Sequence, residues 1–185
     1  MEDLKGKKVA ILATSGFEES ELFEPLKELK ESGAEVFIVA PEKGKIKAWS
    51  KGNWSREIDV DISVYDANED DFDALVLPGG VINPDKLRRD RRVVEFVRSF
   101  FENNKLVASI CHGPQVLIEA DVVQGRTMTS FSSIKTDLIN AGAEWVDGEV
   151  IQDENLITSR SPSDLKAFNR KLIEELAKVE APVRG

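Results

Sequence analysis

The 185-residue chain has one cysteine, one histidine and one tyrosine, and it has no long hydrophobic run. A single cysteine excludes an internal disulfide and is typical of a reducing compartment. No apolar stretch approaches the roughly 18 residues that a membrane-spanning helix needs, and the charged N-terminus leads directly into a predicted strand. The sequence therefore predicts a cytoplasmic protein.

Positive charge is also scarce, with 25 Lys and Arg against 34 Asp and Glu, which gives a formal net charge of −9. This excess of acid opposes binding to nucleic acid or to an anionic membrane, so we predict neither as a partner. Residues 88–92 are a local exception, because four arginines surround Asp90. They suit an acidic partner, ion pairs in a subunit contact or a solvated start of the next helix.

Cofactor and metal signals are weak. One histidine and one cysteine do not form a ligand set of recognised spacing, so no metal site is predicted. A phosphate loop after the first strand would carry Glu18, Glu19 and Glu21, which repel phosphate. The sequence therefore predicts no flavin, nucleotide or other cofactor.

The most informative feature present is the pair Cys111 and His112. Residues 106–110 are typical of a buried strand, and Pro114 suits the first turn of a helix, so Cys111 is expected at the turn between them. Free backbone N–H groups, the helix dipole and a nearby imidazolium would each lower the cysteine pKa from its ordinary value of about 8.5. The pair predicts a thiolate nucleophile. The alternative is a cysteine that only fills the core.

Short apolar strands alternate with amphipathic helices along the chain. Strands are predicted at residues 8–13, 35–40, 73–77 and 106–110, with helices around 22–29, 93–100, 114–120, 134–141 and 162–173. A kink or break is expected near Pro25, an extended segment at 126–131, short antiparallel strands within 44–71, and a hairpin at 149–158. Ser161 is expected to cap the last helix. The pattern predicts one α/β domain over residues 1–185, with a mainly parallel sheet covered by helices on both faces.

Sites in such sheets lie at the carboxyl ends of the strands. Residues 14–19, 78–80 and 111–112 all follow predicted strands, so we expect them to lie together. Glu18 would then direct a carboxyl group toward the thiol, where a protonated acid can donate to sulfur and an ionised one can act as a base. Alternatively, residues 15–18 match a capping box in which Glu18 bonds the backbone.

Two further roles remain open on the residues alone. Gly79 and Gly80 can offer N–H groups to an oxyanion, although Pro-Gly-Gly also serves as a plain turn. His112 needs a partner to fix its tautomer, and no neighbouring residue supplies a carboxylate. That partner is expected from elsewhere in the fold or from another subunit.

The motifs together resemble the PfpI-like family of the parkinsonism-associated deglycase superfamily, which is related to class I glutamine amidotransferase domains. The resemblance covers nearly the whole chain and rests on residues 108–115, 77–80, the loop with Glu18, residues 140–147 and residues 158–162. It implies a flavodoxin-like, doubly wound fold. It also implies Cys111 as nucleophile at a strained elbow, Glu18 bonded to the sulfur, and Gly80 and His112 as backbone donors.

The protease-like branch of that family uses a glutamate from a neighbouring subunit to orient the histidine. The matching position in this sequence is Asp85, whose side chain is one methylene shorter. The histidine after the cysteine favours this branch over the branch of the parkinsonism-associated protein, which lacks it. The resemblance thus implies a homo-oligomer, either a dimer or a hexamer, in which Asp85 acts in trans.

Three functions are compatible with these residues. The first is a stress-response enzyme whose cysteine attacks small reactive carbonyls or their peptide and protein adducts, as a deglycase or glyoxalase. The second is an intracellular cysteine peptidase with an intersubunit triad of Cys111, His112 and Asp85. The third is a redox sensor or protective stress protein that works through oxidation of Cys111.

Overall fold

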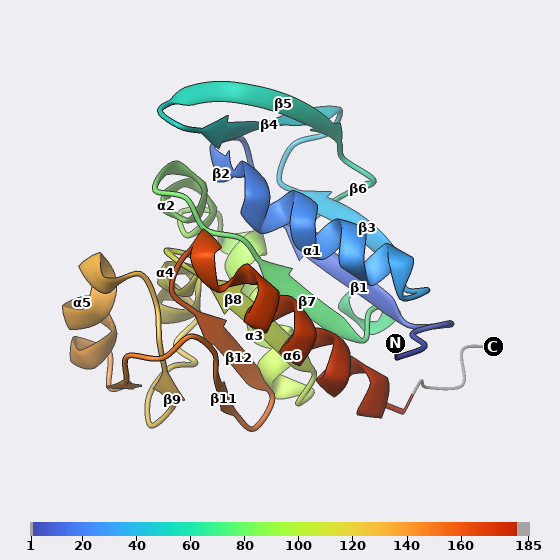
Figure 1. Cartoon of the computed structure of the whole chain (residues 1–185). Helices are drawn as coiled ribbons and strands as arrows, with labels where there is room; N and C mark the ends of the chain where they lie inside the picture. The colour runs from blue at the N-terminus through green and yellow to red at the C-terminus, as the bar shows by residue number, and fades with distance from the viewer. Residues whose placement is uncertain (1, 181–185) are drawn as a thin grey trace.

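A seven-stranded sheet runs through the centre of the computed structural model, which describes residues 2–180 (Figure 1). The strand order is β11-β12-β8-β7-β1-β3-β6. Every neighbouring pair is parallel except β11 and β12, which form the predicted hairpin. The strands are β1 (Lys8–Leu12), β3 (Glu35–Ala40), β6 (Ile62–Ser63), β7 (Ala74–Leu77), β8 (Leu106–Ile110), β11 (Ile151–Asp153) and β12 (Leu156–Ser159). The predicted, mainly parallel sheet is confirmed.

Helices cover both faces of this sheet, as the continuous apolar strands require. Alternate residues of β1 show the division, since Leu12 packs into one buried cluster and Ile11 into the other. The cluster around Ile11 is closed by α1 (Glu19–Glu31) and α6 (Leu165–Lys178), which lie side by side in Figure 1. The opposite cluster receives side chains from α2 (Ile82–Leu87), α3 (Arg91–Glu102), α4 (Pro114–Glu119) and α5 (Lys135–Asn140).

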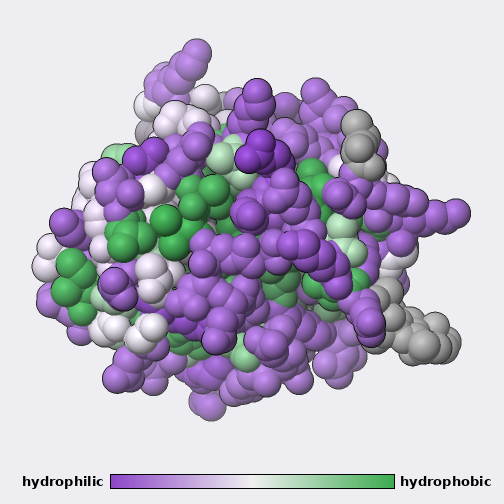
Figure 2. All heavy atoms as spheres, turned by 60° about the horizontal axis from the view of Figure 1, so that its bottom comes forward, coloured by the Kyte–Doolittle hydropathy of each residue, from purple (hydrophilic) through white to green (hydrophobic). Residues whose placement is uncertain are grey.

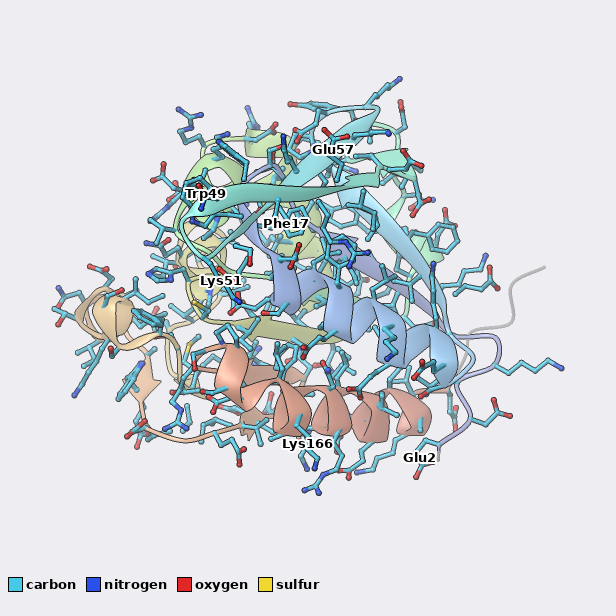
Figure 3. All side chains as sticks on the ribbon, turned by 45° about the horizontal axis from the view of Figure 1, so that its top comes forward. Glu2, Phe17, Trp49, Lys51, Glu57 and Lys166 are labelled. Carbon is cyan, nitrogen blue, oxygen red and sulfur yellow. The ribbon has the colours of Figure 1, made fainter. Side chains whose placement is uncertain are left out.

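A smaller sheet holds the start of α1 in place. It consists of β2 (Phe17–Glu18), β4 (Lys45–Ser50) and β5 (Asn53–Asp59), and its long hairpin confirms the antiparallel strands predicted within residues 44–71. Figure 3 shows Phe17 beneath this hairpin, and the side chain of Phe17 is fully buried. The hairpin thereby fixes the chain segment that enters α1.

Several local predictions differ from the structure. Pro25 lies inside a single uninterrupted α1, because it removes only one helical hydrogen bond while buried Leu22 and Leu29 anchor the helix on both sides. Ser161 does not cap α6 through its side chain. Residues Pro162–Asp164 form a 3-10 turn, so α6 begins only at Leu165.

The segment predicted as extended at 126–131 contains only the short strand β9 (Thr127–Met128), which pairs with β10 (Glu144–Trp145). The helix α2, the strand β10 and the 3-10 turns Glu69–Asp71 and Ser132–Ile134 were not predicted. All four are too short for their apolar residues to form a recognisable period.

The surface in Figure 2 is mostly hydrophilic, as expected for a chain rich in charged residues. Figure 2 shows a face on which hydrophilic side chains dominate and apolar ones are confined to local areas. Among residues 2–180, no helix combines the length and the apolar character that crossing a bilayer requires.

We predict that Gly113→Ala destabilises the fold by about 2 kcal/mol, because overpacking a closed site forces its neighbours apart. A Cβ at Gly113 would lie 2.5 Å from Ser109 Oγ and 2.7 Å from the Leu77 carbonyl oxygen. Urea denaturation measures the loss. The matched control is Gly148→Ala, whose Cβ would meet only the flexible end of Ile151. Equal midpoints for the two variants would contradict this account of the contact between β7, β8 and α4.

Candidate active site

Cys111 occupies a strained turn between β8 and α4. Its φ of 62° lies in the left-handed region, which a residue with a Cβ rarely adopts. Two hydrogen bonds hold this conformation: the Cys111 N–H donates to the Ser159 carbonyl at 3.1 Å, and the Phe131 N–H donates to the Cys111 carbonyl at 2.9 Å. The elbow predicted from residues 106–114 is therefore present.

The sulfur lies in a polar cradle although the residue is only 6% exposed. The backbone N–H groups of Gly80 and His112 both donate toward the sulfur, and both lower the pKa of the thiol. Gly80 can approach because it adopts a φ of 85° against the backbone of residues 16–18, where a Cβ would not fit. These donors match the roles expected for Gly80 and His112.

The N–H of Gly79 has another partner. It donates to Glu21 Oε1 at 2.9 Å, so it is not available for a developing oxyanion. The oxyanion role predicted for Gly79 is therefore corrected: this glycine positions Glu21. A side chain at Gly79 would come within 2.8 Å of both Cys111 Cβ and Glu21 Oε1, which explains why glycine is needed there.

The carboxyl group beside the sulfur belongs to Glu21. Its side chain is fully buried, and it interacts directly with Cys111. Burial raises the pKa of Glu21 to about 8, since the hydrogen bond from Gly79 offsets only part of the lost hydration. Glu21 is consequently protonated at neutral pH. Its second oxygen, Oε2, has no partner with hydrogen-bond geometry among the described residues, which leaves the acid group facing the thiol.

The sequence analysis assigned this contact to Glu18, and the structure corrects it. Glu18 is the last residue of β2 and the N-cap of α1, where its N–H donates to the Gly79 carbonyl at 3.3 Å. The first turn of α1 carries Glu21, three residues later, inward toward β8. The capping box is also absent, because neither Ser15 nor Glu18 makes a side-chain cap bond to α1. Glu18 acts on the site only indirectly, since its charge further raises the pKa of Glu21.

The pKa of Cys111 shifts in the direction opposite to the one predicted from the sequence. Burial is the main cause that raises the pKa of Cys111 above its ordinary value, and the charge of an ionised Glu21 adds to it. The helix-start donors lower the pKa but do not outweigh these effects. Formation of the thiolate therefore requires an acceptor for its proton and a neutral Glu21.

His112 is placed to be that acceptor. Its Nδ1 lies 3.2 Å from the sulfur, and its Nε2 lies 3.0 Å from Ser133 Oγ. The ring stacks on Phe131 with 4.7 Å between centroids. Burial lowers the pKa of His112, so the imidazole is neutral at pH 7. In the tautomer that carries its hydrogen on Nε2, this nitrogen donates to Ser133 Oγ and the lone pair of Nδ1 faces the thiol.

Asp85 does not meet His112 in the same chain through a hydrogen bond within residues 2–180, although both line one cavity of about 570 Å³. Ser133 Oγ already lies at hydrogen-bond distance from His112 Nε2, the nitrogen that Asp85 of another subunit would need to contact. The triad with Asp85 of another subunit remains a prediction.

Sequence reasoning missed Ser133 and the role of Glu21. Ser133 lies 21 residues after His112 in the sequence, in a 3-10 turn that has no periodic signal. No local pattern singles out Glu21, because Glu19 and Glu21 both lie in the first turn of α1 and the rotation of the helix decides which side chain faces the strand ends. On the sequence alone, Glu21 had no role beyond the repulsion of phosphate.

The strained cysteine, the donors around it and the buried glutamate define a cysteine-centred site on a doubly wound sheet. The DJ-1/PfpI family matches residues 7–175, and the chain belongs to this family. The resemblance read from the sequence is thus confirmed.

Two relatives and one solved structure illustrate the similarity. General stress protein 18 of Bacillus subtilis is 47% identical over 94% of this chain and 99% of its own length. Deglycase PfpI of Pyrococcus furiosus is 45% identical over 91% of this chain and 99% of its own length. The crystal structure of Drosophila melanogaster DJ-1beta has a TM-score of 0.84 and 32% identity, and the match covers 95% of this chain and 92% of that one.

We predict that Glu21→Gln raises stability in alkaline solution. The folded-state pKa of about 8 lies above the ordinary 4.5, so the contribution of Glu21 is fully present below pH 4.5 and is lost as pH rises through about 8. A neutral glutamine avoids that loss, which is on the order of 5 kcal/mol at pH 9. Thermal unfolding at pH 4.5 and pH 9 measures it. A variant no more stable than wild type at pH 9 would contradict the buried acid, and Glu24→Gln, at an exposed position of α1, is the control.

Proposed function

We propose that this protein is a cysteine-dependent enzyme that converts reactive 2-oxoaldehydes, or their early adducts on amines, into 2-hydroxy acids. The observation that carries this proposal is the contact of one thiol with both a neutral imidazole and a protonated carboxyl group. The names of relatives such as Deglycase PfpI and General stress protein 18 support the same class of chemistry and a role in stress. No cofactor takes part in the scheme.

The first step is addition of sulfur to the aldehyde carbon. A bond forms between Cys111 Sγ and that carbon, the thiol proton moves to His112 Nδ1, and the carbonyl electrons move to oxygen. The proton then passes from His112 to this oxygen, which gives a hemithioacetal. For an early adduct, the same attack breaks the carbon–nitrogen bond, and His112 protonates the departing amine.

The second step moves hydrogen between the two carbons of the adduct. His112 removes the proton from the sulfur-bearing carbon, and the neighbouring carbonyl oxygen gains a proton, which gives an enediol. The hydroxyl on the sulfur-bearing carbon then loses its proton as that carbon becomes a carbonyl, and the neighbouring carbon gains one from His112. The first carbon is oxidised as the second is reduced, so no outside oxidant is needed. Water hydrolyses the resulting thioester to a 2-hydroxy acid and restores the thiol.

Glu21 and Ser133 support these steps from two sides. Protonated Glu21 donates to the sulfur while it carries negative charge, and an ionised Glu21 would repel that charge. Ser133 accepts from Nε2–H and so keeps the Nδ1 lone pair toward the thiol. Ser133 is a positioning residue, because it acts through His112.

Two other functions use the same thiol. Oxidation of Cys111 to a stable sulfinic acid would also benefit from the Glu21 proton. A peptidase would need an oligomer in which Asp85 of another subunit replaces Ser133 at His112 Nε2. The donor set favours carbonyl chemistry, since His112 already has a partner within its own chain.

We predict that the wild-type protein forms lactate from methylglyoxal and that Cys111→Ser does not, because a hydroxyl with a far higher pKa cannot form the adduct at neutral pH. Measuring lactate, rather than loss of methylglyoxal, excludes simple trapping by amines and thiols. The Glu24→Gln variant, altered at an exposed position of α1, serves as control and should retain activity. Equal lactate formation by Cys111→Ser would remove the thiol from the mechanism. Negligible turnover with selective sulfinic acid after peroxide would favour the redox role.

We further predict that Ser133→Ala lowers kcat for lactate formation about tenfold with little change in KM, because the imidazole loses the partner that fixes its tautomer. Ser133→Thr, which keeps the hydroxyl, should restore most of the rate. The adjacent Ser132→Ala variant controls for loop disturbance. A decrease in kcat that is the same for the alanine and threonine variants would mean that Ser133 is only structural.

A further inference from the structure

Two cavities meet at α2 and the turn that follows it. The cavity of about 570 Å³ contains His112 and Ser133 and is called here the histidine cavity. A second cavity of about 1150 Å³, the outer cavity, lies at the carboxyl ends of β1 and β3 and is lined by Thr14, Tyr65 and the arginine-rich segment. Lys86 and Arg89 line both cavities, so a ligand in one meets the same cations as a ligand in the other.

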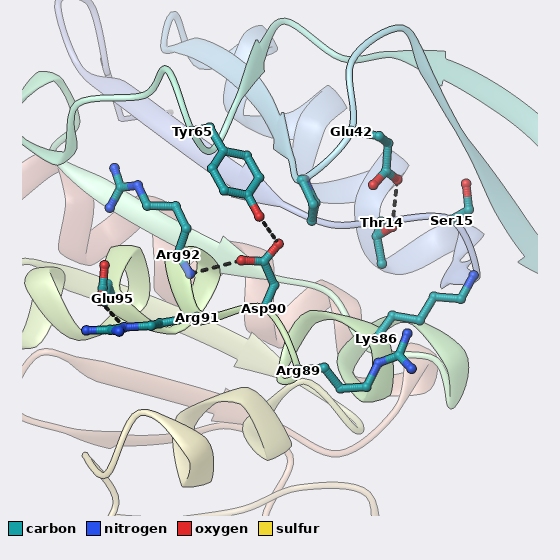
Figure 4. Close-up of a pocket in the computed structure, with 11 residues that line it drawn as sticks. Thr14, Ser15, Glu42, Tyr65, Lys86, Arg89, Asp90, Arg91, Arg92 and Glu95 are labelled. Atoms are coloured by element: carbon teal, nitrogen blue, oxygen red, sulfur yellow. Dashed lines mark hydrogen bonds and ion pairs between the residues drawn. The ribbon is translucent and has the colours of Figure 1, made fainter.

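Most charged groups of the outer cavity already have partners (Figure 4). Asp90 accepts from the Tyr65 hydroxyl and caps α3, and Glu42 accepts from Thr14. Arg91 pairs with Glu95 and Arg92 pairs with Glu69. Two arginines of residues 88–92 are thus explained, because Arg91 forms an ion pair within α3 and Arg92 joins α3 to Glu69.

Lys86 and Arg89 differ from these residues. Neither makes a salt bridge or a side-chain hydrogen bond with the described part of the chain, and Figure 4 shows the Arg89 guanidinium beside the Lys86 side chain. Two cations three residues apart repel each other, and this repulsion is relieved when an anion lies between them. Both side chains are exposed at the cavity wall, in a chain whose net charge is −9.

We propose that Lys86 and Arg89 form an anion subsite and that the preferred substrate carries a phosphate or carboxylate group close to its reactive carbonyl. This inference rests on the proposed function, which it narrows to anionic carbonyl compounds or adducts. The reacting carbon lies beside His112, which lines the histidine cavity, and the anionic group extends through this cavity toward Lys86 and Arg89.

The donor set fits an oxyanion. Arg89 offers two parallel N–H donors to two oxygens, and Lys86 adds a compact charge. Figure 4 shows the Lys86 ammonium turned toward the loop that carries Ser15. The Ser15 oxygen accepts from the Lys47 N–H, which leaves its own hydrogen to donate to a ligand. Phosphate and carboxylate oxygens can both accept from these donors. The donors recognise the anionic group and make no demand on the rest of the ligand.

Alkylation of Cys111 tests the subsite without any turnover. Iodoacetate and iodoacetamide present the same reactive carbon, but only the first is anionic. We predict that the double variant Lys86→Gln/Arg89→Gln lowers the ratio of the iodoacetate rate to the iodoacetamide rate about fivefold. Arg91→Gln is the control and should keep the wild-type ratio, because Arg91 lines the outer cavity but not the histidine cavity and is paired with Glu95.

An unchanged iodoacetamide rate in the double variant shows that the thiol site is intact, and an unchanged ratio of the two rates then overturns the proposal. Competition at constant ionic strength separates the two anion sources. Inorganic phosphate or acetate should slow iodoacetate in the wild-type protein, and the stronger competitor identifies the group. If neither phosphate nor acetate slows the reaction with iodoacetate, the proposed subsite is also overturned. A protein that forms no lactate but keeps the charge preference would refute the proposed reaction and retain the subsite.

Discussion

A carboxyl group and a thiol lie together inside the protein, where little water reaches them, and the chemistry of the site depends on this placement. Transfer from water disfavours the charged form of each group, and the charge of one opposes the charge of the other. Burial therefore raises the pKa of both Glu21 and Cys111. Only one negative charge is tolerated at a time, so the pair titrates as a unit. Glu21 is then an acid that supports a transient thiolate, rather than a base that creates one.

The fold supplies this environment through close backbone contacts. Gly79 and Gly80 bring β7 against the start of α1, and Gly113 brings α4 against β8. The hairpin of β4 and β5 fixes the chain before α1, which determines that Glu21 faces inward. Strain at Cys111 is sustained by bonds from two separate segments, at Ser159 and Phe131. A site of this kind needs the whole sheet, because its residues come from the ends of several strands.

Much of the fold could be predicted because central strands such as residues 106–110 are uniformly apolar and are separated by clear helical periods. The site was less accessible. The adjacent Cys111 and His112 identified its centre, and Gly80 followed from its turn. The choice between Glu18 and Glu21 depends on the rotation of α1 about its axis, which no local pattern fixes.

No local sequence pattern indicates the contact of Ser133 with His112 or the charge of the Cys111 thiol either. Ser133 reaches His112 only through the path of a loop, and the charge depends on how much water tertiary packing removes. Local sequence suggested a lowered cysteine pKa because it contains the helix-start donors and omits the burial. Glu21, whose charge when ionised adds to the effect of burial on the Cys111 pKa, lies 90 residues earlier in the chain.

Infrared difference spectroscopy of wild type against Glu21→Gln tests the central claim most directly, because it detects the protonated carboxyl group of one residue. The account predicts a carboxylic acid band at neutral pH that disappears as pH rises through about 8. A carboxylate band for Glu21 already present at pH 6, with no acid band, would contradict it.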